Sequence, residues 1–264
     1  MGLYFIAEMK LSPNLTPHSR VVEIERGVWR LELPAGPPGH YRLAQLDDYT
    51  ALPRRAFTWH APVSLTLRAR ASAQVIPGTW GFGFWNNPFG MALFSGADAL
   101  RLPTLPNAAW FFFASPPNAL SLRDDLPGQG WLVATFRSVR LPVVARAFGA
   151  FALPLLVIPP ARRWLRRLGQ RLVRQDAVDL SLDPTDWHTY ELDWLSEQVR
   201  FRVDGSLALE TPVSPPGPLG LVLWVDNQYA ALPAGGRAGW GTLSNPHPAW
   251  VEIADLTVSA SSPI

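Results

Sequence analysis

Short apolar runs, each bounded by Pro, Gly, Asn or Asp, recur along most of the chain. Runs of this length between turn residues are typical of the strands of a β-sandwich or barrel. Residues 211–218 form a Pro-rich connection, and residues 230–248 have the Gly and Ala content of a long loop. We therefore expect one all-β sandwich domain over residues 1–264. The predicted strands lie near 20–25, 28–33, 40–46, 63–70, 80–86, 109–115, 131–137, 177–182, 188–195, 198–204, 206–210, 219–226 and 250–258.

Residues 139–176 break this pattern. The run 141–160, LPVVARAFGAFALPLLVIPP, is apolar apart from Arg146, but its four prolines argue against a membrane-spanning helix. The following residues have helical spacing of apolar positions, and most of their arginines fall on the other side of that helix. We expect a helical insertion near 141–176 within the sandwich domain. It is either an amphipathic element at a membrane surface or an insertion packed over the sandwich with its arginines in solvent. The apolar positions are Ala161, Trp164, Leu165, Leu168 and Leu172.

Composition agrees with an all-β fold, since 12 Trp, 27 Pro and 20 Gly suit strands and turns better than long helices. The chain has no cysteine, which excludes disulfides and thiolate metal sites. The formal net charge is +2, and taking away the six arginines of residues 162–174 leaves −4. The basic charge thus belongs to one segment, and the pattern does not support nucleic-acid binding by a broad basic surface.

The first ten residues, MGLYFIAEMK, lack a basic start followed by a long apolar stretch. A secretory signal is therefore not expected. We expect a cytoplasmic protein or one bound peripherally to a membrane.

Four blocks resemble, in the same order, segments of glycoside hydrolase family 16 and the related concanavalin A-like lectins. They are PGTWGFGFWNNPFG (77–90), WHTYELDWLSEQVRFRVDG (187–205), LGLVLWVDNQYA (219–230) and WVEIADLTVSA (250–260). The resemblance implies a concanavalin A-like jelly-roll sandwich built around a sugar-binding groove. It also implies a carbohydrate as the partner.

The family's catalytic motif, Glu-x-Asp-x-x-Glu, is missing. Its strand should lie between the WGFGFW and GWLVATF blocks, where this chain has AWFFFAS at 109–115, with no carboxylate. The nearest acids are Asp98, Asp124 and Asp125, and no Glu lies between Glu32 and Glu191. Because retaining hydrolysis needs two carboxyl groups about 5–5.5 Å apart, we expect a glycan-binding protein that does not hydrolyse sugars by this route.

Strand alternation suggests which side chains share a face. Trp80, Phe82 and Phe84 should face one way and Trp85 the other, beside Gly81 and Gly83. Two glycines beside a Trp suit close approach of a ligand to the backbone. The predicted ligand-binding groove is lined by Trp85, Trp224, Trp131, Arg68, Arg137 and Asp226. Each Trp could instead belong to the core, Arg68 could face solvent, and Asp226 could begin a turn.

A second function stays open, namely an enzyme or carrier for an apolar small molecule, since Trp110 and three Phe stand where acids are expected. In that case Asp226, Asp47 or Asp48 would be the candidate catalytic acids, although Asp47–Asp48 also suits a surface turn. Whether the chain is an enzyme is left open. The five histidines show no metal-ligand spacing, so no metal or cofactor is expected.

Overall fold

The computed structural model describes residues 4–6, 10–88, 103–140, 159–231 and 239–261. Most of them belong to two large antiparallel sheets. We call the first sheet A. Its strands are, in spatial order, β13 (Ser206–Thr211), β12 (Val199–Val203), β11 (His188–Trp194), β6 (Val63–Ala71), β17 (Ala249–Ser261), β4 (Val28–Leu33) and β3 (Arg20–Glu25), with β1 (Tyr4–Ile6) also paired to β17.

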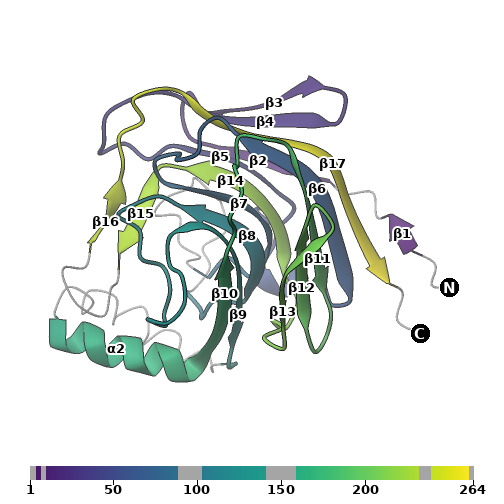
Figure 1. Ribbon diagram of the computed structural model, residues 1–264, viewed down its shortest axis with the longest axis vertical. Coiled ribbons are helices and arrows are strands. Elements are labelled where there is room, and N and C mark those ends of the chain that lie inside the picture. Colours follow the sequence, from purple (N-terminus) through teal and green to yellow (C-terminus); the bar gives the residue numbers. More distant parts are fainter. Residues whose placement is uncertain (1–3, 7–9, 89–102, 141–158, 232–238, 262–264) are drawn as a thin grey trace.

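Sheet B has seven strands. In spatial order they are β10 (Val173–Asp179), β9 (Gly130–Ser138), β8 (Ala108–Ala114), β7 (Thr79–Trp85), β14 (Gly220–Asp226), β5 (Leu43–Asp47) and β2 (Ser12–Leu15). The remaining described elements are a ribbon of β15 (Gln228–Ala231) and β16 (Gly239–Thr242), the short 3₁₀ helix η1 (Arg54–Ala56) and helix α2 (Pro159–Leu172). The chain thus has the predicted concanavalin A-like jelly-roll sandwich with a helical insertion. Figure 1 shows sheet A on one side of sheet B, and α2 with the β15–β16 ribbon on the other.

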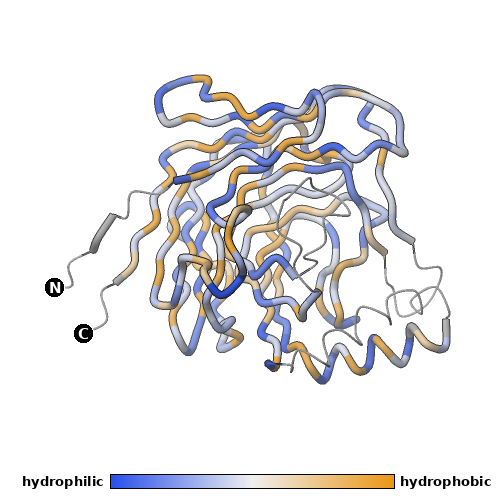
Figure 2. Tube along the Cα trace, turned by 180° about the vertical axis from the view of Figure 1, so that it is seen from behind, coloured by the Kyte–Doolittle hydropathy of each residue, from blue (hydrophilic) through white to orange (hydrophobic). Residues whose placement is uncertain are grey.

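The main core lies between the two sheets. In β6 the residues from Val63 to Ala71 alternate strictly, and every second side chain is buried. The same two-residue period appears as alternating colours along many strands in Figure 2. Each Leu or Phe buried here contributes about 1.5–3 kcal/mol relative to exposure. Members of this core include Leu31, Leu65, Leu67, Trp80, Phe82, Phe84, Phe111, Trp131, Leu192, Phe201, Leu221 and Ile253.

Sheet B has a second apolar cluster on its other face, which we call the outer face. This explains why every residue of β14 and of β5 is buried, whereas β6 of sheet A shows alternation. A strand covered on both sides reads as a continuous apolar run. The cluster includes Leu43, Tyr49, Ala108, Phe112, Leu132, Phe136, Val173, Val222 and Trp224, and Trp85 and Trp110 pack against it.

The predicted helical insertion is present in part. Helix α2 spans Pro159–Leu172, but β10 begins at Val173, so residues 173–176 are strand and not helix. Residues 141–158 lie outside the described part of the chain. Within that described part, no helix is long and apolar enough to cross a bilayer.

The strand predictions are confirmed with two shifts in their bounds. The strand expected at 40–46 is β5 at 43–47, and the one expected at 177–182 is β10 at 173–179. Strand β10 lies at the edge of sheet B and begins with the polar residues RQD after Val173, so its apolar pattern is poor.

The loop expected over 230–248 is wrong in part, because it contains most of the β15–β16 ribbon. Gly239 and Gly241 lie against the ring of Tyr229, so these glycines serve packing within a ribbon and not a flexible loop. Strands β1 and β2 were not predicted either.

Candidate functional site

Five aromatic rings gather on the outer face of sheet B, and we call them the aromatic cluster: Trp85, Trp110, Phe112, Phe136 and Trp224. Trp85 and Trp224 lie nearly parallel with ring centroids 6.5 Å apart, and Trp110 lies 5.7 Å from Trp85 and 5.5 Å from Trp224. Trp85 and Trp110 are half-buried, while Trp224 keeps only 8 % of its exposure. Trp85 and Trp224 therefore share a face, as predicted, but Trp224 lies inside the cluster and not on an open platform.

Two glycines of β7 make room for these rings. A Cβ on Gly81 would lie 2.9 Å from Cη2 of Trp224, and one on Gly83 would lie 2.7 Å from Cβ of Trp110. The space that the glycines leave is thus filled by indole side chains of the neighbouring strands. The expectation that it would admit a ligand to the backbone is wrong.

Strand β8 is the strand on which the sequence resemblance predicts the family's catalytic carboxylates. Its outward side chains are Ala108, Trp110, Phe112 and Ala114, since Phe111 and Phe113 belong to the core between the sheets. None of these side chains carries a carboxyl group. The outward side of β8 is therefore apolar and contributes to the outer face.

A polar edge borders the aromatic cluster at the end of β14. The Thr79 hydroxyl donates to Oδ1 of Asp226 at 2.8 Å, and Trp224 Nε1 donates to the same Thr79 oxygen at 3.0 Å. The Gln228 backbone N–H and the Tyr41 hydroxyl also hydrogen-bond to Asp226. Burial raises the pKa of Asp226 to about 7, against the opposing effect of these hydrogen bonds. Asp226 can therefore hold or release a proton near neutral pH.

Asp47 lies on the same face, and both of its carboxylate oxygens already accept hydrogen bonds from neighbouring groups of the protein. Its carboxylate accepts hydrogen bonds from the Gln45 side chain, the Tyr49 and Thr50 backbone N–H groups and the Thr50 hydroxyl. In the β14–β5 ladder Asp47 lies opposite Val222, four residues from Asp226. At about 3.4 Å per residue this separates the backbones of the two residues by roughly 14 Å along the strand direction.

Asp48 points elsewhere. Its carboxylate accepts the indole N–H of Trp59 at 2.5 Å and the backbone N–H of Leu221 at 2.9 Å. Because Trp59 belongs to the core between the sheets, Asp48 lies outside the outer face. Burial raises its pKa to about 6.

Three residues predicted to line the groove are not on this face. Trp131 is a core residue, stacked on Trp80 with centroids 4.1 Å apart and only 5 % exposed. Arg137 follows the same alternation along β9 and so also points away from the outer face. Arg68 belongs to sheet A, where it faces solvent beside Trp187 and Asp255. The structure brings together Trp85, Trp224 and Asp226 only.

Sequence reasoning missed several residues of this face. Trp110 and Phe112 were recognised as replacing acids but not as neighbours of Trp224, and Tyr41 and Thr79 were not singled out. Thr79 was within reach, because it stands six residues before Trp85 and therefore on its face. The indole N–H groups of Trp85 and Trp110 are buried and have no hydrogen-bond partner among the described residues, as is also true of Trp80 in the core.

Other parts of the described chain offer less chemistry. No group of three His, Asp or Glu among the described residues could hold a metal ion. A hollow of about 600 Å³ is lined by residues of β2, β3, β4, β5 and β17 and shares no residue with the aromatic cluster. Its lining includes Lys10, Val21, Trp29, Leu46 and Leu256.

Comparison with known proteins agrees on the fold. No protein-family model matches the sequence, and no curated protein matches it either. Among solved structures, the β-glucanase of Bacillus licheniformis is similar with a TM-score of 0.51, 11 % identity and coverage of 98 % of each chain. A structure from work on endo-acting O-glycanases of the human gut microbiota is similar with a TM-score of 0.50 and 12 % identity, covering 97 % of this chain and 94 % of the other. The fold of this chain is the jelly-roll sandwich of the family 16-type β-glucanases.

Proposed function

We propose that the protein binds a carbohydrate on the outer face of sheet B without hydrolysing it. The observation that carries the proposal is the aromatic cluster, half-buried at Trp85 and Trp110, beside the polar edge of Asp226, Thr79 and Tyr41. Flat rings pack against the C–H faces of a sugar, and neighbouring polar groups bind its hydroxyls. A mostly apolar site with a few polar groups is the usual form of a ligand site.

The unpaired indole groups add to this argument. A buried N–H without a partner costs about 1–3 kcal/mol, so a ligand acceptor that reached Trp85 or Trp110 would recover that free energy. Sugar hydroxyls are such acceptors.

We infer the absence of hydrolysis from the spacing of the carboxyl groups on the outer face. Retaining enzymes hold two carboxyl groups about 5–5.5 Å apart and inverting enzymes about 6.5–9.5 Å apart. The two buried acids of the described outer face, Asp47 and Asp226, have backbones roughly 14 Å apart along the strand direction, from four residues at about 3.4 Å each. Asp47 is also engaged by Gln45, Tyr49 and Thr50. Neither spacing is met.

The fold supports a glycan as the ligand. The similar solved structures are named as a β-glucanase and as part of work on O-glycanases that initiate mucin breakdown, so both names refer to glycans.

The proposal is tested by screening oligosaccharides and polysaccharides for binding and analysing the same samples for hydrolysis products. Trp85→Ala and Trp224→Ala should each weaken binding at least about tenfold, equivalent to about 1.4 kcal/mol. Trp164→Ala is the matched control, because this Trp is exposed on α2 and away from the cluster. Circular dichroism and the melting temperature show whether each variant is folded. Normal binding by both folded cluster variants would exclude this face, and sugar products would refute the non-hydrolytic part.

A second candidate is an enzyme or carrier for an apolar small molecule on the same face. It is favoured by one observation, namely that β8 presents only Ala108, Trp110, Phe112 and Ala114 there. Asp226 would then be the candidate acid, since its pKa is about 7. This candidate predicts that a hydrophobic compound copurifies with the wild-type protein and is released by denaturation. Ligand-free protein from several expression hosts, detected by mass spectrometry, would count against it.

A further inference from the structure

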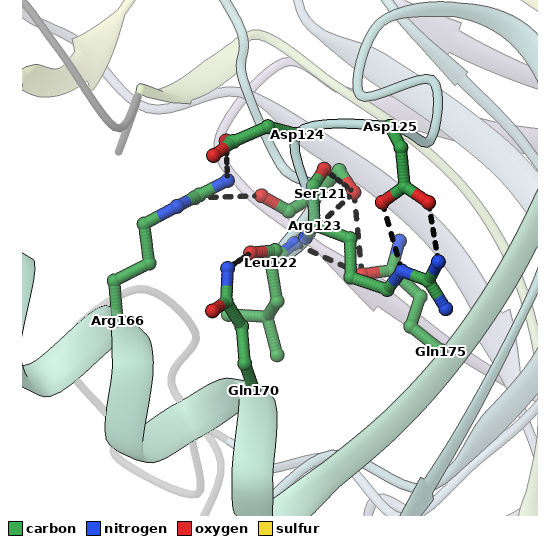
Figure 3. A network of polar contacts seen from close by, with 8 residues as sticks. All are labelled: Ser121, Leu122, Arg123, Asp124, Asp125, Arg166, Gln170 and Gln175. Atoms are coloured by element: carbon green, nitrogen blue, oxygen red, sulfur yellow. Dashed lines mark hydrogen bonds and ion pairs between the residues drawn. The ribbon is translucent and has the colours of Figure 1, made fainter.

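Polar side chains on one side of helix α2 hydrogen-bond to the turn at residues 121–124. The Arg166 guanidinium donates to the Ser121 carbonyl at 2.9 Å and to Oδ1 of Asp124 at 2.5 Å. The Gln170 amide donates to the Leu122 carbonyl at 2.8 Å. Figure 3 shows both side chains reaching from α2 to this turn. One side of the helix is therefore held in place.

Another side of α2 faces solvent and carries two adjacent rows of side chains, which we call the Arg–Trp face. Arg163, Arg167 and Arg171 follow one another at four-residue intervals and are all exposed. Trp164 and Leu168 form the next row, with 62 % and 36 % of their surface exposed. At 1.5 Å per residue the arginine row is about 12 Å long. An exposed Trp of this size beside three cations is not explained by packing within the protein.

The arginine row is unfavourable for the isolated helix. Like charges four residues apart repel each other. The first turn of α2 has no acidic residue, so Arg163 near the helix N-terminus also opposes the helix dipole. Among the described residues, Arg163, Arg167 and Arg171 form no ion pair, whereas Arg166 pairs with Asp124. An anionic partner would relieve this repulsion.

We propose that the Arg–Trp face docks α2 onto the surface of an anionic lipid bilayer. Arginines attract anionic headgroups, and an exposed Trp beside a Leu is suited to the boundary between headgroups and acyl chains. Nucleic acid fits less well, since the chain without the six arginines of 162–174 has a net charge of −4. A phosphate backbone that extended beyond this helix would meet a remainder of net negative charge.

Docking is independent of carbohydrate binding, because α2 and the aromatic cluster share no residue. The two surfaces are nevertheless related in space. Figure 1 shows α2 on the side of sheet B opposite to sheet A, which is also the side of the aromatic cluster. A protein docked through α2 would hold its outer face close to the membrane.

The test is flotation of the full chain with two kinds of vesicles, phosphatidylcholine alone and phosphatidylcholine mixed with phosphatidylglycerol. The wild type should float with the anionic vesicles and not with the neutral ones. The triple variant Arg163→Gln, Arg167→Gln, Arg171→Gln should partition about 100-fold more weakly, as expected from about 1 kcal/mol for each basic residue. Trp164→Ala should also weaken flotation, and added salt should weaken it further.

The matched control is Trp240→Ala, which removes an equally exposed Trp, 56 %, from β16 and should float like the wild type. Circular dichroism confirms that the triple variant is folded. Equal flotation of wild type and triple variant, equal binding to both vesicle types, or no flotation at all would each overturn the proposal. Sugar binding measured in parallel is expected to be the same for all four proteins, so failure here is distinguishable from failure of the carbohydrate proposal.

Discussion

Replacing Asp226 by Asn should remove a large part of the pH dependence of stability. The carboxyl group has a pKa of about 7 in the folded protein and an ordinary value near 3.8. Between these values the folded state binds more protons than the unfolded state, so the free energy of unfolding falls as pH rises. At about 1.36 kcal/mol for each pKa unit, the loss between pH 4 and pH 7 is about 4 kcal/mol, and it levels off above pH 7.

The substitution is conservative at this position. An Asn oxygen can still accept from the Thr79 hydroxyl and the Gln228 N–H, while its amide can donate to the Tyr41 oxygen. If the substitution changes the free energy of unfolding by the same amount at every pH, the test is unaffected, because it compares only how that free energy varies with pH. The assay is urea unfolding of both proteins at intervals from pH 4.5 to pH 8.5.

The wild type should lose stability relative to Asp226→Asn across this range. Asp48→Asn serves as a comparison, because Asp48 has a pKa of about 6 and its contribution should be complete about one pH unit lower. A constant difference between wild type and Asp226→Asn at every pH would show that Asp226 is not a buried, mostly protonated carboxyl group. The account of the polar edge would then be wrong.

Three further substitutions test the packing by their unfolding free energies in urea. Glu252→Gln should lower the free energy of unfolding by about 2–3 kcal/mol, because this fully buried carboxylate pairs with two arginines. Glu210→Gln, at an exposed ion pair, should lower it by less than about 1 kcal/mol. Similar losses for the two variants would contradict the buried ion pairs of Glu252. Gly81→Ala should lower the free energy of unfolding by about 1–3 kcal/mol and shift Trp224 fluorescence, because the new Cβ would lie 2.3 Å from the Phe111 carbonyl oxygen and 2.9 Å from the Trp224 ring. An unchanged free energy of unfolding would mean that the Trp224 ring moves freely. Asn227→Ala should lower the free energy of unfolding by about 3 kcal/mol, since three hydrogen bonds of its buried side chain are lost at about 1 kcal/mol each. A loss below about 1 kcal/mol would argue against these hydrogen bonds.

The sequence predicts the strands and the local faces well where apolar and polar positions alternate. In β7 the division between Trp80, Phe82 and Phe84 on one side and Trp85 on the other is confirmed, and Trp224 and Asp226 share a face as expected. Periodicity within one strand is enough for such a prediction, because it depends only on strand geometry.

Which face a side chain points to could not be predicted for all strands. Trp131 was assigned to the groove because both faces of sheet B are apolar, so the pattern of β9 does not distinguish core from outer face. Arg68 was assigned to the groove although β6 belongs to the other sheet. Membership of a sheet depends on pairing between distant strands, which a single sequence does not reveal.

The aromatic side chains of β8 have a consequence for how the chain could change. Trp110 and Phe112 have centroids 5.5 Å apart, and both lie within 6 Å of the Trp224 ring. A carboxylate introduced alone in place of Phe112, which is only 7 % exposed, would be buried among aromatic rings without a partner, at a cost of several kcal/mol. A catalytic carboxylate therefore cannot be introduced at Phe112 by one substitution without loss of stability. It would require the neighbouring rings to be replaced together, so the stability of the fold maintains the apolar form of this face.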